Sequence, residues 1–458
     1  MTHQIQKQIL DVTFHAPESA ASVLQHRLSE WANGSLAAAV AQALDACTTA
    51  EEHLYLEELT IEIKTVSLDN FEHELPHQIA QALTRAIKDK LAQTQGAKAI
   101  LKTSNQSTME ALGYFLQTGL LPWAYRIPTG QTWEQTIREA FLHEPALMKS
   151  VLLPLLQNVT VRERLITQFS QSFLEEILAY FHTQSIAQVK LFFETLFAVN
   201  NGGISVDIHL IIRQIWNDLW EKVAESQALE INEVIQKNWQ NQDRSTRNIL
   251  EKAIVPLAKQ DAVYWGTLLT QLQSQKYKSN LSKTSDKDTT PLEVDEIYLP
   301  HAGLVLLHPF LPRFFEGILC AADDELVWVE KAALSLHFLA TGQSEAPEYE
   351  LAVAKVLCGI PLGQTLPKAV AWQQQDTEEA EALLGAVIKY WPVLKDSSID
   401  ILRAEFLQRA GKLSRRADGW LLQVEKRDFD IYLLAELPWS FSTIKLPWMK
   451  EFLWVEWI

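Results

Sequence analysis

The chain has 458 residues, 47% of them hydrophobic and 21% charged, so we expect a folded globular protein of two or three domains, not a disordered one. Its formal net charge of −17 argues against a nucleic-acid-binding protein, because a phosphate-binding surface needs an excess of basic residues. The three cysteines are too few and too widely spaced for a disulfide framework or a CxxC metal site, which favours reduced thiols and a cytoplasmic protein.

Residues 1–100 predict a small β-α-α-β-α module. Leu10, Val12 and Phe14 alternate as in a half-buried strand, and residues 54–63 indicate a second strand with a bulge at 57–58. Between the strands, residues 20–31 and 36–46 predict helices that are broken at Asn33-Gly34. Apolar residues recur every fourth position in the last predicted helix, at Ile79, Leu83, Ile87 and Leu91.

Residues 101–270 predict a helical domain. Prolines and the Gly202-Gly203 pair punctuate the helices, and no fixed sequence period identifies a named repeat. Residues 271–290 contain few large apolar side chains and predict a polar linker. Three apolar faces carry the helical prediction, namely Ile166, Phe169, Phe173, Ile177 and Tyr180; Val189, Phe192, Phe193 and Leu196; and Ile208, Ile211, Ile215, Leu219 and Val223.

Residues 291–458 predict an α+β domain. Trp420, Leu422 and Val424 recur at every second position as in a strand, as do Phe429, Ile431 and Leu433. Ala417-Asp418-Gly419 supplies the turn of a β-hairpin before the first run. Residues 351–357 and 378–390 predict helices. The predicted fold class of the whole chain is therefore α+β and predominantly helical.

Several sequence motifs occur near both ends of the chain. The C-terminal part carries LLHPFLPRFFE from Leu306, and the N-terminal part carries HQIQKQILDVTF from His3. These motifs, and the others that follow them, resemble the contractile injection system tape measure proteins of phage-tail-like particles over roughly 120 residues at one end and 160 at the other. The remaining motifs are LQHRLSEW (24–31), LEELTIEI (56–63), GYFLQTGLLPW (113–123), LHFLATG (336–342), KVLCGIPLGQ (355–364), KLSRRADGWLLQVE (412–425) and IKLPWM (444–449).

The resemblance implies a non-enzymatic structural and assembly protein. It would engage the inner tube or its end, take part in setting tube length, and have tube, baseplate or cap proteins as partners. One continuous helix of the whole chain would reach only about 690 Å, and the prolines of the middle segment argue against such a rod. An assembly chaperone, a tube-end adaptor or an unrelated helical scaffold that binds a cytosolic protein remain alternatives.

The candidate partner-binding residues are aromatic or basic and lie near the C-terminus. Uncovered terminal tryptophans would form an apolar patch, and an arginine pair beside the predicted turn could meet an acidic partner. The candidates are Pro447, Trp448, Trp454, Trp457, Arg415 and Arg416. We interpret the HPFLPRFF motif as core, through His308, Pro309, Phe310, Leu311, Pro312, Phe314 and Phe315.

The sequence predicts neither an enzyme nor a cofactor. His73-Glu74-Leu75-Pro76-His77 matches the HExxH pattern of zinc peptidases, but Pro76 disfavours the helical geometry that the pattern needs, and we expect it to open a helix that leaves His73 outside. His301 and His308 lack further ligands nearby, so we expect hydrogen-bonded core residues. Nucleotide-binding and acyl-transfer loops are absent, and no apolar run approaches the roughly 18 residues that a membrane span requires.

Overall fold

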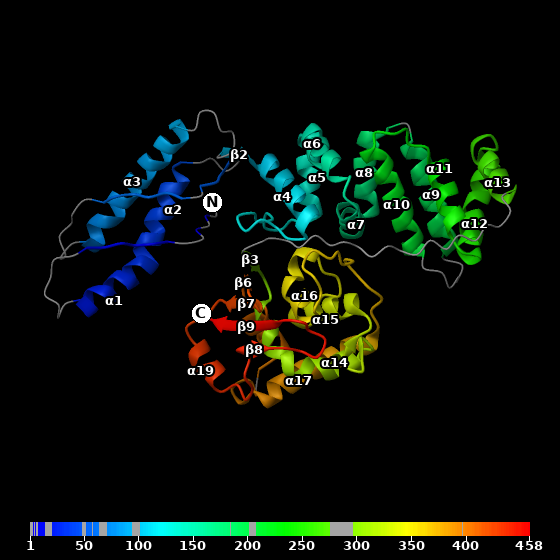
Figure 1. The fold of residues 1–458 in the computed structure, drawn as a ribbon. Helices are drawn as coiled ribbons and strands as arrows, with labels where there is room; N and C mark the ends of the chain where they lie inside the picture. Colours follow the sequence, from blue (N-terminus) through cyan, green and yellow to red (C-terminus); the bar gives the residue numbers. More distant parts are fainter. Residues whose placement is uncertain are drawn as a thin grey trace. The chain divides into compact units, whose positions relative to one another are not determined.

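A computed structural model describes residues 3, 5, 8–13, 21–47, 52–56, 58–63, 71–93, 101–183, 185–200, 208–274, 296–395 and 397–458. The predicted fold class, α+β and predominantly helical, is confirmed (Figure 1). The chain separates into two compact units. Unit 1 comprises residues 1–110, 124–131 and 139–144, and unit 2 comprises residues 111–123, 132–138 and 145–458.

Unit 1 contains a pair of packed helical segments and a two-stranded sheet. α1 (Ala21–Trp31), the π-helical turn η2 (Ala32–Leu36) and α2 (Ala37–Asp45) run on without interruption, and α2 packs against α3 (Phe71–Gln93). β1 (Glu52–Leu54) pairs antiparallel with β2 (Leu101–Thr103). The predicted break at Asn33-Gly34 is wrong, because the π turn accommodates these residues in helical geometry.

Three further N-terminal predictions need correction. The first predicted strand does not form, because Leu10 and Val12 are exposed and lie in no strand; Phe14 lies outside the described residues. The second reaches only Leu54, where β1 ends, and residues 58–63 lie in no strand. α3 begins at Phe71, so His73 lies inside the helix and Pro76 does not open it. A proline at the sixth helical position removes a single intrahelical hydrogen bond, which the remaining turns of the helix tolerate.

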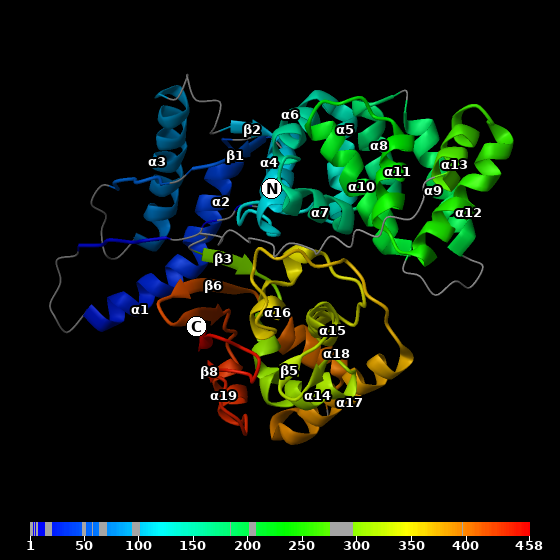
Figure 2. The same cartoon turned by 45° about the vertical axis from the view of Figure 1, so that its right-hand side comes forward.

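The described residues between 104 and 274 are mostly helical, as predicted. α10 packs against α7 and α11, and α12 packs against α9 and α13 (Figures 1 and 2). The helices are α4 (Ser104–Thr118), α5 (Trp133–His143), α6 (Pro145–Leu155), α7 (Val159–Gln168), α8 (Gln171–Phe181), α9 (Ile186–Asn200), α10 (Ile208–Ala224), α11 (Ile231–Asn241), α12 (Arg244–Gln260) and α13 (Tyr264–Ser274).

Hydrophobic periodicity located two of the three apolar faces. Every residue of the predicted faces on α9 and α10 is buried. The first predicted face spans two helices instead of one, because the Ser170 hydroxyl accepts a hydrogen bond from Phe173 N and caps α8. The start of the predicted linker, residues 271–274, belongs to α13, where Leu272 is buried; its remainder lies outside the described residues.

A five-stranded mixed sheet forms one side of the C-terminal region. Its order is β3 (Glu296–Leu299), β6 (Gly411–Arg416), β7 (Gly419–Val424), β9 (Phe452–Trp457) and β8 (Thr443–Ile444), and only β7 and β9 are parallel. The predicted hairpin is confirmed as β6 and β7, joined by Ala417-Asp418. A side chain at Gly419 would place its Cβ 2.1 Å from the backbone oxygen of Phe452, so this crossing requires glycine.

Short helices cover the inner face of this sheet and enclose a large apolar core. The predicted strand at 429–433 is wrong: these residues begin α19, because Asp430 accepts a hydrogen bond from Arg427 N and pairs with buried Arg409. The elements are η3 (Ala302–Phe310), α14 (Leu311–Gly317), β4 (Ala321–Ala322), β5 (Glu325–Leu326), α15 (Val329–Thr341), η4 (Glu348–Glu350), α16 (Ala352–Leu357), α17 (Gln374–Tyr390), η5 (Pro392–Leu394), α18 (Ile399–Leu402), η6 (Arg403–Leu407) and α19 (Asp430–Ala435).

Across the described ranges, the structure contains no helix with the length and apolar character needed to cross a membrane.

Candidate protein-interaction surface

The strand register divides the side chains of the C-terminal sheet between two faces. Leu413, Leu422 and Val455 lie in one cross-strand row and are buried against the helices. The neighbouring row, Ser414, Leu421 and Trp454, therefore faces the other way. We name this side the outer face; its partly exposed or exposed residues are Glu296, Tyr298, Lys412, Ser414, Arg416, Gln423, Thr443, Phe452, Trp454 and Glu456.

Trp454 and Phe452 form an aromatic pair on the outer face. Their rings stack with centroids 5.9 Å apart at an interplanar angle of 29°, and Lys445 Nζ lies 4.6 Å from the Phe452 centroid. The indole Nε1 of Trp454 is buried and has no hydrogen-bond partner among the described residues. A rigid aromatic pair beside a cation is typical of the anchors of protein interfaces.

The two candidate arginines lie at the hairpin end and are each engaged within the chain. Arg415 donates two hydrogen bonds to Glu451, at 2.6 and 2.5 Å, and its guanidinium lies 4.8 Å from the Trp420 centroid. Hydrogen bonding between them raises the pKa of Arg415 and lowers the pKa of Glu451. Arg416 lies 3.5 Å from Glu456. A partner that binds here would meet paired charges and not two unengaged cations.

The structure separates Trp448 and Trp457 from Trp454. Trp448 Nε1 donates to the backbone oxygen of Leu357 at 2.8 Å, and its ring packs 5.4 Å from Phe315. Trp457 Nε1 donates to Asp430 at 2.8 Å. Both indoles are thus held by the domain that carries them. Pro447 is exposed beside Trp448.

The HPFLPRFF motif contributes unevenly to the core. Leu311, Phe314 and Phe315 are buried, as expected. Pro309 is exposed, and its assignment to the core is wrong because it lies at the end of η3, where the chain passes to α14. The half-buried residues are His308, whose Nδ1 lies 3.0 Å from the backbone oxygen of Val305, Phe310, whose ring packs edge-on against Trp439, and Pro312 in the first turn of α14.

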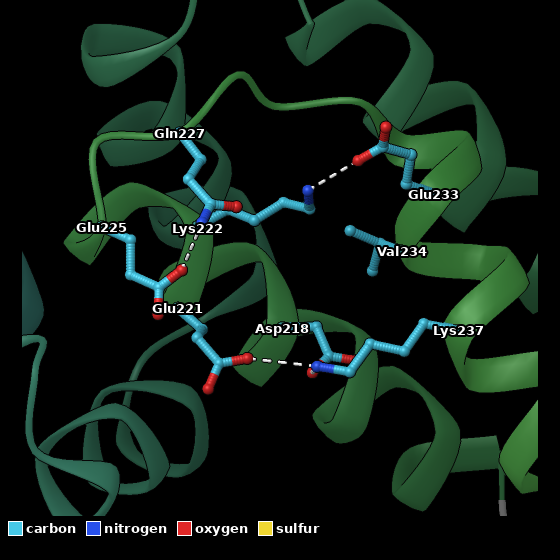
Figure 3. Close-up of a pocket in the computed structure, with 8 residues that line it drawn as sticks. All are labelled: Asp218, Glu221, Lys222, Glu225, Gln227, Glu233, Val234 and Lys237. Atoms are coloured by element: carbon cyan, nitrogen blue, oxygen red, sulfur yellow. Dashed lines mark hydrogen bonds and ion pairs between the residues drawn. The ribbon is translucent and has the colours of Figure 1, made fainter.

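A cavity of about 350 Å³ lies along α10 and α11 (Figure 3). Lys222 Nζ lies 2.7 Å from Glu233, and Lys237 Nζ lies 2.8 Å from Asp218. Each lysine pairs with a carboxylate of the other helix, so these ion pairs link α10 to α11. The lining lacks the apolar character of small-molecule sites.

The histidines considered as metal ligands have different environments. His73 and His77 are exposed on α3, and His77 Nε2 lies 2.8 Å from the Gln81 side chain. His301 instead meets His337 and Glu350, which the sequence did not single out because Glu350 lies 49 residues further along the chain. No local spacing signals such a cluster.

The chain matches a known protein family. The sequence model for the family described as contractile injection system tape measure protein matches residues 2–457. The curated proteins and the solved structures gave no match. The match extends across both units and covers the middle helices, which the motifs at the two ends had left uncovered.

Proposed function

We propose, since the chain belongs to the contractile injection system tape measure protein family, that it is a non-enzymatic assembly component that engages the inner tube or its end. The family match over residues 2–457 is the observation that carries this proposal. Its partners would be tube, baseplate or cap proteins of the particle, and it would act in the cytoplasm while the particle assembles.

The helices favour an adaptor at the tube end over an extended ruler. The longest uninterrupted helical stretch in the described part runs from α1 through η2 to α2; it has 25 residues and is about 38 Å long. The helices from α6 to α13 pack against one another, and their apolar faces are buried in doing so. Extending them into a rod would expose these faces to water, at about 25 cal/mol for each Å² of apolar surface.

The outer face of the C-terminal sheet is the surface that we assign to the particle. Trp454 and Phe452 offer fixed aromatic area, and fixed aromatic residues carry a large share of the binding energy in many interfaces. The Trp454 ring is partly exposed, so a partner would contact its apolar edge and not its buried N–H. Trp448 and Trp457 would support this surface from beneath.

Particle production with Trp454→Ala tests the assignment. We expect fewer assembled particles in electron micrographs, while the purified variant melts like the parent. Phe429→Ala is the matched control, because Phe429 is an aromatic residue with 73% exposure that lies outside the outer face. Normal particle yield from the Trp454 variant would remove the outer face as the docking surface.

The adaptor role has its own test. Duplication of α12 and α13 should leave tube length unchanged if the chain acts at the tube end, whereas a ruler predicts tubes that lengthen with the insertion. Deletion of the chain should abolish regular particles in either case. Particles of normal number and length without the chain would contradict the assembly function itself.

A further inference from the structure

Three potential metal ligands from separate elements converge in the C-terminal region. His301 precedes η3, His337 lies on α15 and Glu350 ends η4. Glu350 Oε2 lies 2.9 Å from His337 Nε2 and 3.4 Å from His301 Nε2. One ligand atom from each residue lies within 4.8 Å of the other two. Two imidazoles and one carboxylate therefore surround a common point.

The surroundings of His337 favour a cation at that point. Its Nδ1 lies 3.3 Å from both the backbone oxygen of Gln343 and the Thr341 hydroxyl, and its Nε2 faces the Glu350 carboxylate. A neutral imidazole carries one N–H, so it cannot donate to both Gln343 and Glu350. If Nδ1–H donates to Gln343, Nε2 presents a lone pair toward the carboxylate, and a metal ion would bind both. A carbonyl partner on the second ring nitrogen is the usual support of a metal-bound histidine.

His301 is held in an uncommon position. Its φ of 61° lies in the left-handed region, and the residue is only 8% exposed. Its Nδ1 is buried without a hydrogen-bond partner among the described residues, so Nε2 is the ring nitrogen that meets a polar group. The ring instead lies 5.4 Å from that of His337, edge to face, with Nε2 toward the shared carboxylate.

Charge and access complete the arrangement. The Glu350 carboxylate supplies a negative charge beside two imidazoles, which is a donor set that suits a divalent cation. The Glu350 side chain is 28% exposed, whereas that of His337 is 1% exposed. Solvent therefore reaches the cluster from the carboxylate side, where a water could serve as a fourth ligand.

We propose that His301, His337 and Glu350 form a zinc-binding site that ties the start of η3, α15 and η4 together. Zinc takes imidazole and carboxylate ligands at about 2.0–2.2 Å, which places tetrahedral ligand atoms about 3.3 Å apart. The distances of 2.9 and 3.4 Å between the ligand atoms are close to this spacing. Binding would link three elements that are distant in sequence and stabilise the fold that presents the outer face.

Metal analysis of the purified full-length chain tests the proposal. After removal of metal with a chelator and addition of zinc chloride, we expect one zinc per chain and a melting temperature that rises with zinc concentration. Glu350→Gln and His337→Ala should each lower zinc affinity by at least tenfold, while His77→Ala, in the exposed HExxH string, should bind zinc like the parent. Zinc binding that is absent, or equal in all four proteins, would overturn the site.

Cobalt binding to the parent protein provides a second readout if the variants fail to fold. Tetrahedral cobalt gives an intense visible absorption, whereas octahedral cobalt in solution gives a weak one. We expect the intense band to grow to one equivalent of cobalt and to disappear when zinc is added. A weak band throughout the titration would show that the two histidines donate ordinary hydrogen bonds to Glu350, and would reject the metal site.

Discussion

Arg164 of α7 and Glu348 of η4 form a fully buried bidentate ion pair, although 184 residues separate them in the chain. Arg164 Nε donates to Oε2 at 2.9 Å, and its Nη2 donates to Oε1 at 3.2 Å. Lys355 Nζ donates to the same carboxylate at 2.7 Å. One buried carboxylate thus connects the helices before the predicted linker with the region after it.

Glu348→Gln should destabilise the protein strongly. The substitution leaves two buried cations without their counter-charge, which costs about 3–5 kcal/mol. The measurement is the free energy of unfolding in urea. Glu233→Gln is the matched control, because Glu233 pairs with Lys222 but is 65% exposed, and the loss there should not exceed about 1 kcal/mol. Equal losses at the two positions would show that the buried pair has no special role.

Sequence periodicity recovered the elements whose partners are numerous and apolar. α9 and α10 each pack against several helices, and each apolar position on their predicted faces is buried. Short apolar patterns, by comparison, did not distinguish a strand from a helix. The apolar positions at 429, 431 and 433 fit a strand, but the hydrogen bond from Arg427 N to Asp430 and the Asp430–Arg409 pair select a helix.

The sequence predicted only part of the candidate interaction surface. The sequence pointed to the terminal tryptophans, but it could not show that Trp454 faces outward while Trp457 bonds to Asp430, since that difference depends on the register of β9 against β7. The Arg164–Glu348 pair and the cluster around Glu350 were not found. Each joins residues brought together by the tertiary fold, with no spacing that a single sequence displays.

The two tryptophans of β9 should differ in their effect on stability. Trp457→Phe removes the hydrogen bond to Asp430, a loss of about 1.5–3 kcal/mol for a charged acceptor. Trp454→Phe removes no hydrogen bond to a described residue and should change stability by about 0.5 kcal/mol or less. Thermal and urea unfolding of the two variants provide the comparison. A larger loss at Trp454 would mean that this residue serves the core.

Glu134 should make the contact between α5 and α8 sensitive to acid. Burial raises the pKa of its carboxyl, but hydrogen bonds from Ser170 and Arg138 outweigh burial and hold it below the ordinary value of 4.5. The folded-state pKa is therefore below the unfolded one. The stabilisation that Glu134 provides is fully present above about pH 4.5 and is lost as the pH falls through the folded-state pKa.

Glu134→Gln tests this pH dependence. The variant should be less stable than the parent at neutral pH, and the difference should shrink as the pH falls below about 4.5, in urea unfolding measured at a series of pH values. Ser170→Ala removes the hydroxyl donor while keeping the carboxylate, so it should weaken the same pH dependence. A constant difference between parent and Glu134→Gln across this range would contradict the assignment.

Two glycines should respond to alanine in opposite directions. In η3, a Cβ at Gly303 would lie 1.7 Å from the backbone oxygen of Phe406, an overlap that only a backbone shift in η3 or η6 can relieve. In α17, a Cβ at Gly385 would meet no atom within 4 Å. We expect Gly303→Ala to cost about 3 kcal/mol or more, the upper range for overpacking. Gly385→Ala should instead add about 0.5–1 kcal/mol, because alanine loses less backbone entropy than glycine when a helix forms. Unfolding in urea measures both changes, and a tolerated Gly303→Ala would mean that η3 does not pack against η6 as closely as the structure shows.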